Sequence, residues 1–214
     1  MALTFYYASG SPFAWRVWLA LEHKQLAYEH KVMSFSAGDL KKPEFLAINP
    51  RHKVPAIVED GFALYESQAI LEYLEERHPA RPSLFPGDLR QRALVRRIVQ
   101  EADQYLIVAF DPLIDQIFFT PQDQWDLGAI EKAHAKLVEE LRRWEDLPAA
   151  DFLAGKEPSA ADFAAYPHLA LGLRLEKKKP DLDVRGGLGP RLRAWMARVE
   201  ALPFFQKTWP PHWK

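Results

Sequence analysis

The feature that most constrains the fold is a change of sequence pattern near residue 80. Before that point, short β-rich segments alternate with segments of helical spacing, whereas every later periodic segment is helical. Such an order is typical of an α+β unit followed by an all-α unit. The stretch PARPSLFPGD separates the two patterns and has the composition of a linker. We therefore expect one domain over residues 1–80, a linker over 81–89 and an all-helical domain over 90–214.

The first domain is predicted to have the order β-α-β-α-β-β-α. LTFYY and AYEHKVM are strand-like, and SPFAWRVWLALEHK between them has helical spacing. Ser11 suits the N-cap of that helix and Pro12 its first position. KKPEFLAINP indicates a short irregular helix, PAIVED and FALYE give a hairpin signal around Gly61, and SQAILEYLEERH indicates a final helix.

The second half shows apolar residues at three–four spacing, which predicts helices. One stripe comprises Leu94, Ile98, Tyr105 and Ala109, and a second comprises Leu127, Ile130, Leu137, Leu141 and Trp144. PSAADFAAYPHLALGL predicts a third helix, in which Ser159 and Asp162 fit a capping box. A fourth helix is indicated by Leu192, Trp195, Met196 and Val199.

Charge and cysteine content exclude several classes of function. The net charge is −1, and residues 1–82 carry 9 Lys+Arg against 10 Asp+Glu, so neither half has the basic footprint of a nucleic-acid binder. The chain shows no membrane span of roughly 18 apolar residues and no secretory signal, so we expect a cytoplasmic protein that contacts no membrane. The absence of cysteine removes disulfides, thiolate metal sites and a cysteine nucleophile, and no metal is expected.

Pro55 stands at the head of an apolar run that otherwise has the pattern of a strand. Proline donates no ladder hydrogen bond, so a central strand position suits it poorly. Either Pro55 only begins a strand, or the neighbouring backbone serves something other than a strand.

Four motifs, in order and at matching spacing, carry a family resemblance: SPFAWRV, NPRHKVPAIVEDG, LYESQAILEYLEE and SAADF. With the predicted domain order, they make nearly the whole chain resemble a cytosolic glutathione transferase. The WRV and EYLEERHP stretches are similar to bacterial, serine-type members of the zeta and theta kind. The resemblance implies a thioredoxin-like first domain in which the Val54–Pro55 bond is cis. Val54 and Pro55 would then belong to the glutathione-binding set, with the Val54 backbone facing the cysteinyl part.

The resemblance also implies which residues hold the charged ends of glutathione. Ser67 would bind the γ-glutamyl carboxylate, because a helix N-terminus presents free N–H groups and partial positive charge. Glu66 would pair with the ligand's ammonium, while Lys53 and His52 would lie near the glycyl carboxylate. His52 departs from the glycine that is frequent at its position. The alternative interpretations are that Ser67 is only a helix cap and that Lys53 and His52 are solvated surface residues.

The reaction implied by the family needs a thiolate, and a thiol of pKa about 8.5 is only a few per cent ionised at neutral pH. Ser11 resembles the family's catalytic serine, whose O–H would donate a hydrogen bond to the sulfur. A bond to a charged group is worth about 1.5–3 kcal/mol, or one to two pKa units, against about 0.3–1 kcal/mol from the helix terminus. Tyr7 and Ser9 are the alternatives for this role, and Ser11 could also be a plain N-cap.

The second substrate implied by the family is an apolar electrophile, bound between the domains. Its candidate lining residues, each alternatively a core residue, are Phe13, Tyr105, Ile107, Phe110, Phe118 and Phe119. The family also implies a homodimer in which Asp103 reaches the partner's glutathione site, the alternative being an exposed helix charge. The terminal WPPHWK could cover the active site or pack as a tail.

Two other functions stay open on the sequence. One is a glutathione-dependent isomerase similar to maleylacetoacetate isomerase, which often has a second serine and a cysteine where this chain has Pro12 and Phe13. The other is a non-catalytic domain of this fold in a regulatory or translation complex, which the retained glutathione-binding motifs argue against. Thioredoxin-type redox chemistry is excluded because the chain lacks cysteine.

Overall fold

The computed structural model describes residues 2–148 and 150–213. They group into two compact units: residues up to Pro86 together with those from Leu202 onward, and Gly87–Ala201. The sequence pattern assigned the C-terminal residues to the helical domain, whereas the structure groups them with the first unit. Within the two described ranges, none of the helices combines the length and apolar character that crossing a membrane requires.

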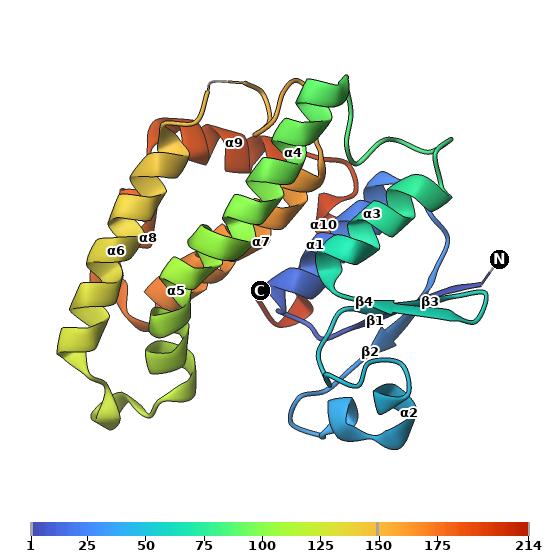
Figure 1. Cartoon of the computed structure of the whole chain (residues 1–214). Helices are drawn as coiled ribbons and strands as arrows, with labels where there is room; N and C mark the ends of the chain where they lie inside the picture. The colour runs from blue at the N-terminus through green and yellow to red at the C-terminus, as the bar shows by residue number, and fades with distance from the viewer. Residues whose placement is uncertain (1, 149, 214) are drawn as a thin grey trace. The chain divides into compact units, whose positions relative to one another are not determined.

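The first unit is built on a mixed sheet of four strands, in the order β2-β1-β3-β4 (Figure 1). The strands are β1 (Leu3–Tyr7), β2 (Glu29–Val32), β3 (Ala56–Glu59) and β4 (Phe62–Tyr65). β1 pairs with β2 in parallel and with β3 antiparallel, and β3 pairs with β4 antiparallel. The predicted order of strands and helices is confirmed, and with it the α+β class.

The helices of the first unit are α1 (Pro12–His23), α2 (Pro43–Leu46), α3 (Ser67–Arg77) and α10 (Phe205–Thr208). Because side chains alternate along a strand, β1 serves both faces of the sheet. Tyr7 packs on Trp18 of α1, with ring centroids 4.8 Å apart. Tyr6 faces Phe45 of α2, at 5.9 Å. The sheet therefore lies between α1 and α3 on one face and α2 on the other (Figure 1).

The β3–β4 connection is a two-residue hairpin, as the Gly61 signal predicted. Asp60 and Gly61 both have positive φ, 50° and 86°. Two-residue hairpins need this conformation because it matches the right-handed twist of the strands, and Asp-Gly supplies it at low cost. The turn leads into β4, and α3 begins two residues after β4 ends.

The second unit is helical. Its helices are α4 (Leu89–Glu101), α5 (Ile107–Ile114), α6 (Leu127–Glu145), α7 (Ala160–Lys178), α8 (Val184–Gly187) and α9 (Pro190–Glu200). The capping box is confirmed, because Asp162 accepts from the Ser159 amide at 2.9 Å. Asp162 also accepts from Trp195 Nε1 of α9 at 2.7 Å, so the cap ties two helices together.

The first predicted apolar stripe of the second unit is wrong in part. Tyr105 is 57% exposed, and the neighbouring Leu106 is buried in its place. The reason is a π-helical segment, Ala102–Leu106, between α4 and α5. A π turn takes more residues than an α turn, so it moves the buried face on by one position. A second π segment, Asp115–Phe119, follows α5. Leu127 of the second stripe is also exposed, at the first position of α6.

Candidate active site

A hollow of about 140 Å³ lies in the first unit, beside the start of α3. It is lined by Phe13, Asn49, Lys53, Val54, Pro55, Glu66 and Ser67. The set joins most of the glutathione-binding residues predicted from the sequence to Phe13 of α1. His52 is exposed next to the hollow and is not part of its lining.

The segment before β3 has a defined backbone. The Val54–Pro55 peptide bond is cis, which confirms the expectation drawn from the family resemblance. Asn49, only 2% exposed, donates to the Lys53 carbonyl at 2.8 Å and accepts from the Arg51 amide at 3.0 Å. Asn49 thus closes the loop that presents Val54, a role the sequence analysis missed. The Asn-Pro pair that begins this loop is a turn signal that could have pointed to it.

His52 and Glu66 share an unusual backbone conformation. Their φ angles are 46° and 71°, in the left-handed region that non-glycine residues rarely adopt. This conformation explains why glycine suits the position of His52. Residues held in this region cost about 1–3 kcal/mol and cluster at functional sites. Glu66 occupies the N-cap of α3 without a side-chain capping bond, and its side chain is exposed.

Ser67 is the first residue of α3 rather than its cap, and it is 7% exposed. Its Oγ accepts a hydrogen bond from Nη1 of Arg16 at 3.3 Å. Because the hydroxyl oxygen accepts, its proton is left to donate to a ligand. Arg16 has no exposed surface, and its guanidinium carbon lies 5.3 Å from the centre of the Phe13 ring. A permanent positive charge therefore lies behind the N-terminus of α3.

Arg16 was missed as a functional candidate. Its signal was an arginine within the apolar face of the predicted first helix, where buried cations normally require an anionic or polar partner. The hollow thus combines a helix N-terminus, a serine hydroxyl and a buried guanidinium, which together suit a carboxylate.

The segment between β1 and α1 carries the hydroxyls predicted to activate a thiol. Ser11 is the N-cap of α1, and its Oγ accepts from the Ala14 amide at 3.3 Å. Ser9 Oγ lies 2.9 Å from Nδ1 of His212. Tyr7 is 8% exposed, and burial raises the pKa of its hydroxyl. The three candidates therefore differ in environment: Ser9 and Ser11 lie in a partly exposed loop, and Tyr7 lies in the core.

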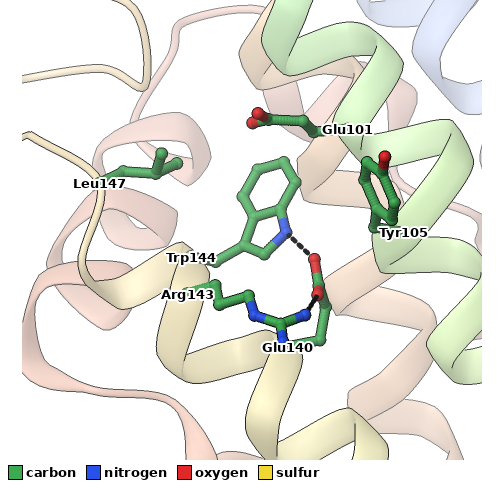
Figure 2. A pocket seen from close by; sticks show the side chains of 6 residues that line it. All are labelled: Glu101, Tyr105, Glu140, Arg143, Trp144 and Leu147. Atoms are coloured by element: carbon green, nitrogen blue, oxygen red, sulfur yellow. Dashed lines mark hydrogen bonds and ion pairs between the residues drawn. The ribbon is translucent and has the colours of Figure 1, made fainter.

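A larger hollow, of about 340 Å³, lies within the helical unit (Figure 2). Its lining residues are Glu101, Tyr105, Glu140, Arg143, Trp144 and Leu147. Figure 2 shows the Glu140 carboxylate bridged to the Trp144 indole and the Arg143 guanidinium, at 2.9 Å and 3.2 Å. Apart from Tyr105, this hollow contains no residue predicted to serve catalysis, and its central carboxylate is already occupied by these two donors.

The other predicted electrophile-contacting residues have different environments within the helical unit. Ile107 and Phe110 are buried core residues, at 5% and 0% exposure. Phe118 is half-buried, with Lys178 Nζ 5.1 Å from its ring centre, and Phe119 is 78% exposed. Asp103 Oδ1 lies 3.6 Å from Nε2 of the buried His168. The assignments of an electrophile pocket and of a partner contact at Asp103 stay predictions.

Comparison with known proteins bears on these observations. The family description "Glutathione S-transferase, N-terminal domain" matches residues 10–77, and "Glutathione S-transferase, C-terminal domain" matches residues 128–198. The structure of a glutathione S-transferase from the Antarctic clam Laternula elliptica shares 30% identity and a TM-score of 0.81, over 100% of this chain and 94% of that chain. The chain belongs to the glutathione S-transferase family.

Two curated relatives extend the comparison of this glutathione transferase. Glutathione S-transferase A of Pleuronectes platessa is 28% identical over 99% of this chain and 92% of that protein. Probable maleylacetoacetate isomerase 2 of Drosophila melanogaster is 44% identical, over 41% of this chain and 39% of that protein. The chain is therefore an enzyme of the glutathione transferase type, and its family uses glutathione as substrate.

Proposed function

We propose that this glutathione transferase activates the glutathione thiol through the hydroxyl of Ser11 and adds the thiolate to a small apolar electrophile. The observation that carries the proposal is the hollow of the first unit, which joins Lys53, Val54, Glu66 and Ser67 to Phe13 of α1. That helix begins at the Ser11 cap, two residues before Phe13. The binding residues and the candidate activating hydroxyl thus belong to adjoining parts of one unit.

The binding end of the site follows from the charges of glutathione. Ser67 donates its hydroxyl proton to the γ-glutamyl carboxylate, and Arg16 supplies positive charge behind it. Glu66, exposed beside Ser67, pairs with the ligand's ammonium. The backbone of Val54, next to the cis bond to Pro55, receives the cysteinyl part. Support for this assignment comes from the Arg16–Ser67 bond, which uses the serine oxygen and leaves its proton available.

The glycyl carboxylate is assigned to the exposed cations before β3. Lys53 belongs to the lining of the hollow, whereas His52 lies beside it. Lys53 is therefore the principal partner of this carboxylate, and His52 is an outer one.

The thiol end relies on Ser11. Its Oγ accepts from the Ala14 amide, so the cap and a donated O–H are compatible in one hydroxyl. Burial raises the pKa of the Tyr7 hydroxyl, and the Tyr7 ring is enclosed by Trp18 and Phe5. This enclosure favours the loop serines over Tyr7 as donors to a ligand. The serine needs no general base because it stabilises an anion already formed.

The remaining features of the proposal rest on the family. The residues proposed to contact the electrophile are Phe13, Tyr105 and Phe118, each of which is at least partly exposed. The enzyme works as a homodimer in the cytoplasm, and Asp103 contacts the partner subunit. Light scattering tests the dimer, and a mass of 24.6 kDa in solution, that of a single chain, would contradict it.

The test is ultraviolet difference absorbance of bound glutathione, titrated across pH, for wild type and Ser11→Ala. We expect the mutant to raise the thiol pKa by about one to two units and to cut turnover at least about tenfold. Ser36→Ala, an exposed serine, is the matched control. A titration and turnover unchanged in Ser11→Ala would overturn the assignment. Failure of wild type to bind immobilised glutathione would favour a non-catalytic domain of this fold.

A second candidate function is glutathione-dependent isomerisation, favoured by the similarity to the Drosophila isomerase. In this chain Pro12 and Phe13 follow Ser11, where such isomerases often have a serine and a cysteine. Assay of maleylacetoacetate turnover against conjugation of a general electrophile separates the two. Faster isomerisation, with glutathione returned unchanged, would favour the second candidate.

A further inference from the structure

The C-terminal segment of the chain packs on the first turns of α1 (Figure 1). The Trp15 ring meets Trp209 and Trp213 nearly at right angles, each at 5.4 Å between centres. Trp15 Nε1 donates to Thr208 Oγ1 at 2.9 Å, and this bond is buried. Trp213 is 4% exposed. The segment is therefore a packed part of the first unit, and Lys214 lies outside the described residues.

This packing brings His212 against the loop between β1 and α1. Nδ1 of His212 lies 2.9 Å from Ser9 Oγ, a contact between residues 203 positions apart. Gly10, with φ of 86°, makes the approach possible. A Cβ atom at Gly10 would lie 2.9 Å from His212 Cε1, which is too close for a real Cβ contact. It would also lie 3.1 Å from Trp213 Nε1, which is tighter than most Cβ contacts. Loop and tail thus fit each other only with glycine between the two serines.

The direction of the Ser9 bond follows from the other nitrogen of the imidazole. Trp213 Nε1 donates to His212 Nε2 at 3.0 Å, and an indole N–H can only donate. Nε2 must therefore be an acceptor without a proton. A neutral imidazole in that state carries its proton on Nδ1, so His212 donates to Ser9 Oγ. Trp213 fixes the tautomer, and the tautomer fixes which way the serine bond runs.

Because its oxygen accepts from His212, the hydroxyl of Ser9 has its own proton left to donate. Ser11 is in the same state, since its oxygen accepts from the Ala14 amide. We infer that His212 is a positioning residue that orients the Ser9 hydroxyl to donate a second hydrogen bond to the glutathione sulfur, beside that of Ser11. This inference rests on the proposed function. It adds a residue from the far end of the chain to thiol activation.

The experiment compares wild type with Ser9→Ala, His212→Phe and His212→Asn. Phenylalanine keeps a flat ring without a donor, whereas the asparagine amide can supply an N–H close to the place of Nδ1. The readouts are the midpoint of the thiolate titration, the dissociation constant of S-methylglutathione and the melting temperature. His134→Phe, in α6 of the other unit, is the matched histidine control.

We expect Ser9→Ala and His212→Phe each to raise the thiol midpoint by about one to two units, the size of one hydrogen bond to a charged group. Binding of S-methylglutathione should not change, because that ligand has no ionisable thiol. His212→Asn should restore most of the shift. The double variant Ser9→Ala/His212→Phe should shift no further than Ser9→Ala alone, because both changes remove one interaction.

Each contrary result has a separate meaning. A wild-type midpoint in Ser9→Ala would overturn the inference, as would additive shifts in the double variant. A thiolate band absent from wild type itself would overturn the proposed function instead. If His212→Phe lowers the melting temperature enough to prevent titration, Ser9→Ala still decides the matter, because it leaves His212 and the tryptophans that pack on Trp15 unchanged.

Discussion

The two ends of helix α1 are both held by segments from elsewhere in the first unit, but by different interactions. At the C-terminal end, Lys24 has no exposed surface, and its Nζ contacts Glu75 at 2.8 Å and the Pro82 carbonyl at 3.1 Å. Glu75 also accepts from the Ser83 hydroxyl and from the Leu84 amide. At this end, the hydrogen bonds of the buried Lys24 and of Glu75 all go to other groups of the protein.

At the N-terminal end, aromatic packing replaces the ion pair. Trp15 is enclosed by the C-terminal tryptophans, and the nearby hydroxyls of Ser9 and Ser11 accept hydrogen bonds without giving up their own protons. The hydroxyl oxygens at this end are hydrogen-bonded, while the hydroxyl protons remain able to donate to a ligand. The contrast teaches that the same helix can be fastened at one end for stability while the other keeps donors for a ligand.

The largest effect on stability should come from breaking the ion pair at the C-terminal end of α1. Glu75→Gln leaves the buried Lys24 charge without its partner, so we expect the free energy of unfolding to fall by about 3–5 kcal/mol. Urea unfolding measures this, with Glu76→Gln at the exposed neighbouring position as the control. Where Glu75→Gln remains folded, its thiol titration should match wild type. A shifted titration would mean that the two ends of α1 are coupled.

The pH dependence of stability tests the same end. Burial raises the pKa of Glu75, but hydrogen bonds from Lys24, Ser83 and Leu84 outweigh it and lower the pKa overall. A lowered pKa in the folded state gives stability that is present above the unfolded value of about 4.3 and is lost as pH falls through the folded value. Wild type should therefore lose more stability than Glu75→Gln below about pH 4.3. Parallel acid profiles would contradict this expectation.

Ser67→Ala tests the carboxylate site, where the Ser67 hydroxyl contacts Arg16 of α1. The variant removes a hydroxyl donor to a carboxylate, a bond worth about 1.5–3 kcal/mol, so glutathione affinity should fall at least about tenfold. Calorimetric titration measures the dissociation constant. The thiol midpoint of bound glutathione should stay at the wild-type value. Unaltered affinity would remove Ser67 from the carboxylate site.

Ser11→Asp separates the two uses of one hydroxyl. Aspartate is as good an N-cap as serine, so the melting temperature should stay close to that of wild type. It cannot donate to a thiolate at neutral pH, so turnover should fall at least about tenfold, or about 1.4 kcal/mol. Ser11→Ala should lose both the cap and the donor. Equal turnover in wild type and Ser11→Asp would show that Ser11 acts only as a cap.

The smallest effect is expected from Thr208→Val. It removes the acceptor of Trp15 Nε1 while keeping the shape of the side chain, which should cost about 1 kcal/mol of stability. Urea unfolding measures it, and the thiol titration should change little because the tryptophan rings remain packed. A loss as large as that in Glu75→Gln would erase the difference between the two ends of α1.

The sequence predicted the parts of the site that lie close together along the chain. The loop before Pro55, the hairpin at Gly61 and the start of α3 follow one another, and short-range turn and cap signals specify them. The capping box at Ser159 was predictable for the same reason, because its two partners are three positions apart.

Long-range contacts could not be predicted in this way. Arg16 meets Ser67 across 51 positions, and Ser9 meets His212 across 203. Neither pair leaves a periodic or local signal, because the contacts exist only once the sheet has formed and the tail has packed. The exposure of Tyr105 was missed for another reason, since a π turn changes the helical period on which the prediction relied.

The tail that packs on Trp15 has a consequence for biosynthesis. The first unit is discontinuous, since its N-terminal part and residues 205–213 are separated by the whole helical unit. During translation, at about 5–20 residues per second, domains tend to fold as they emerge. The helical unit is therefore complete before the ribosome has made the tryptophans that cover α1. Trp15 of the nascent first unit therefore stays uncovered until residues 205–213 have been synthesised and can pack on it.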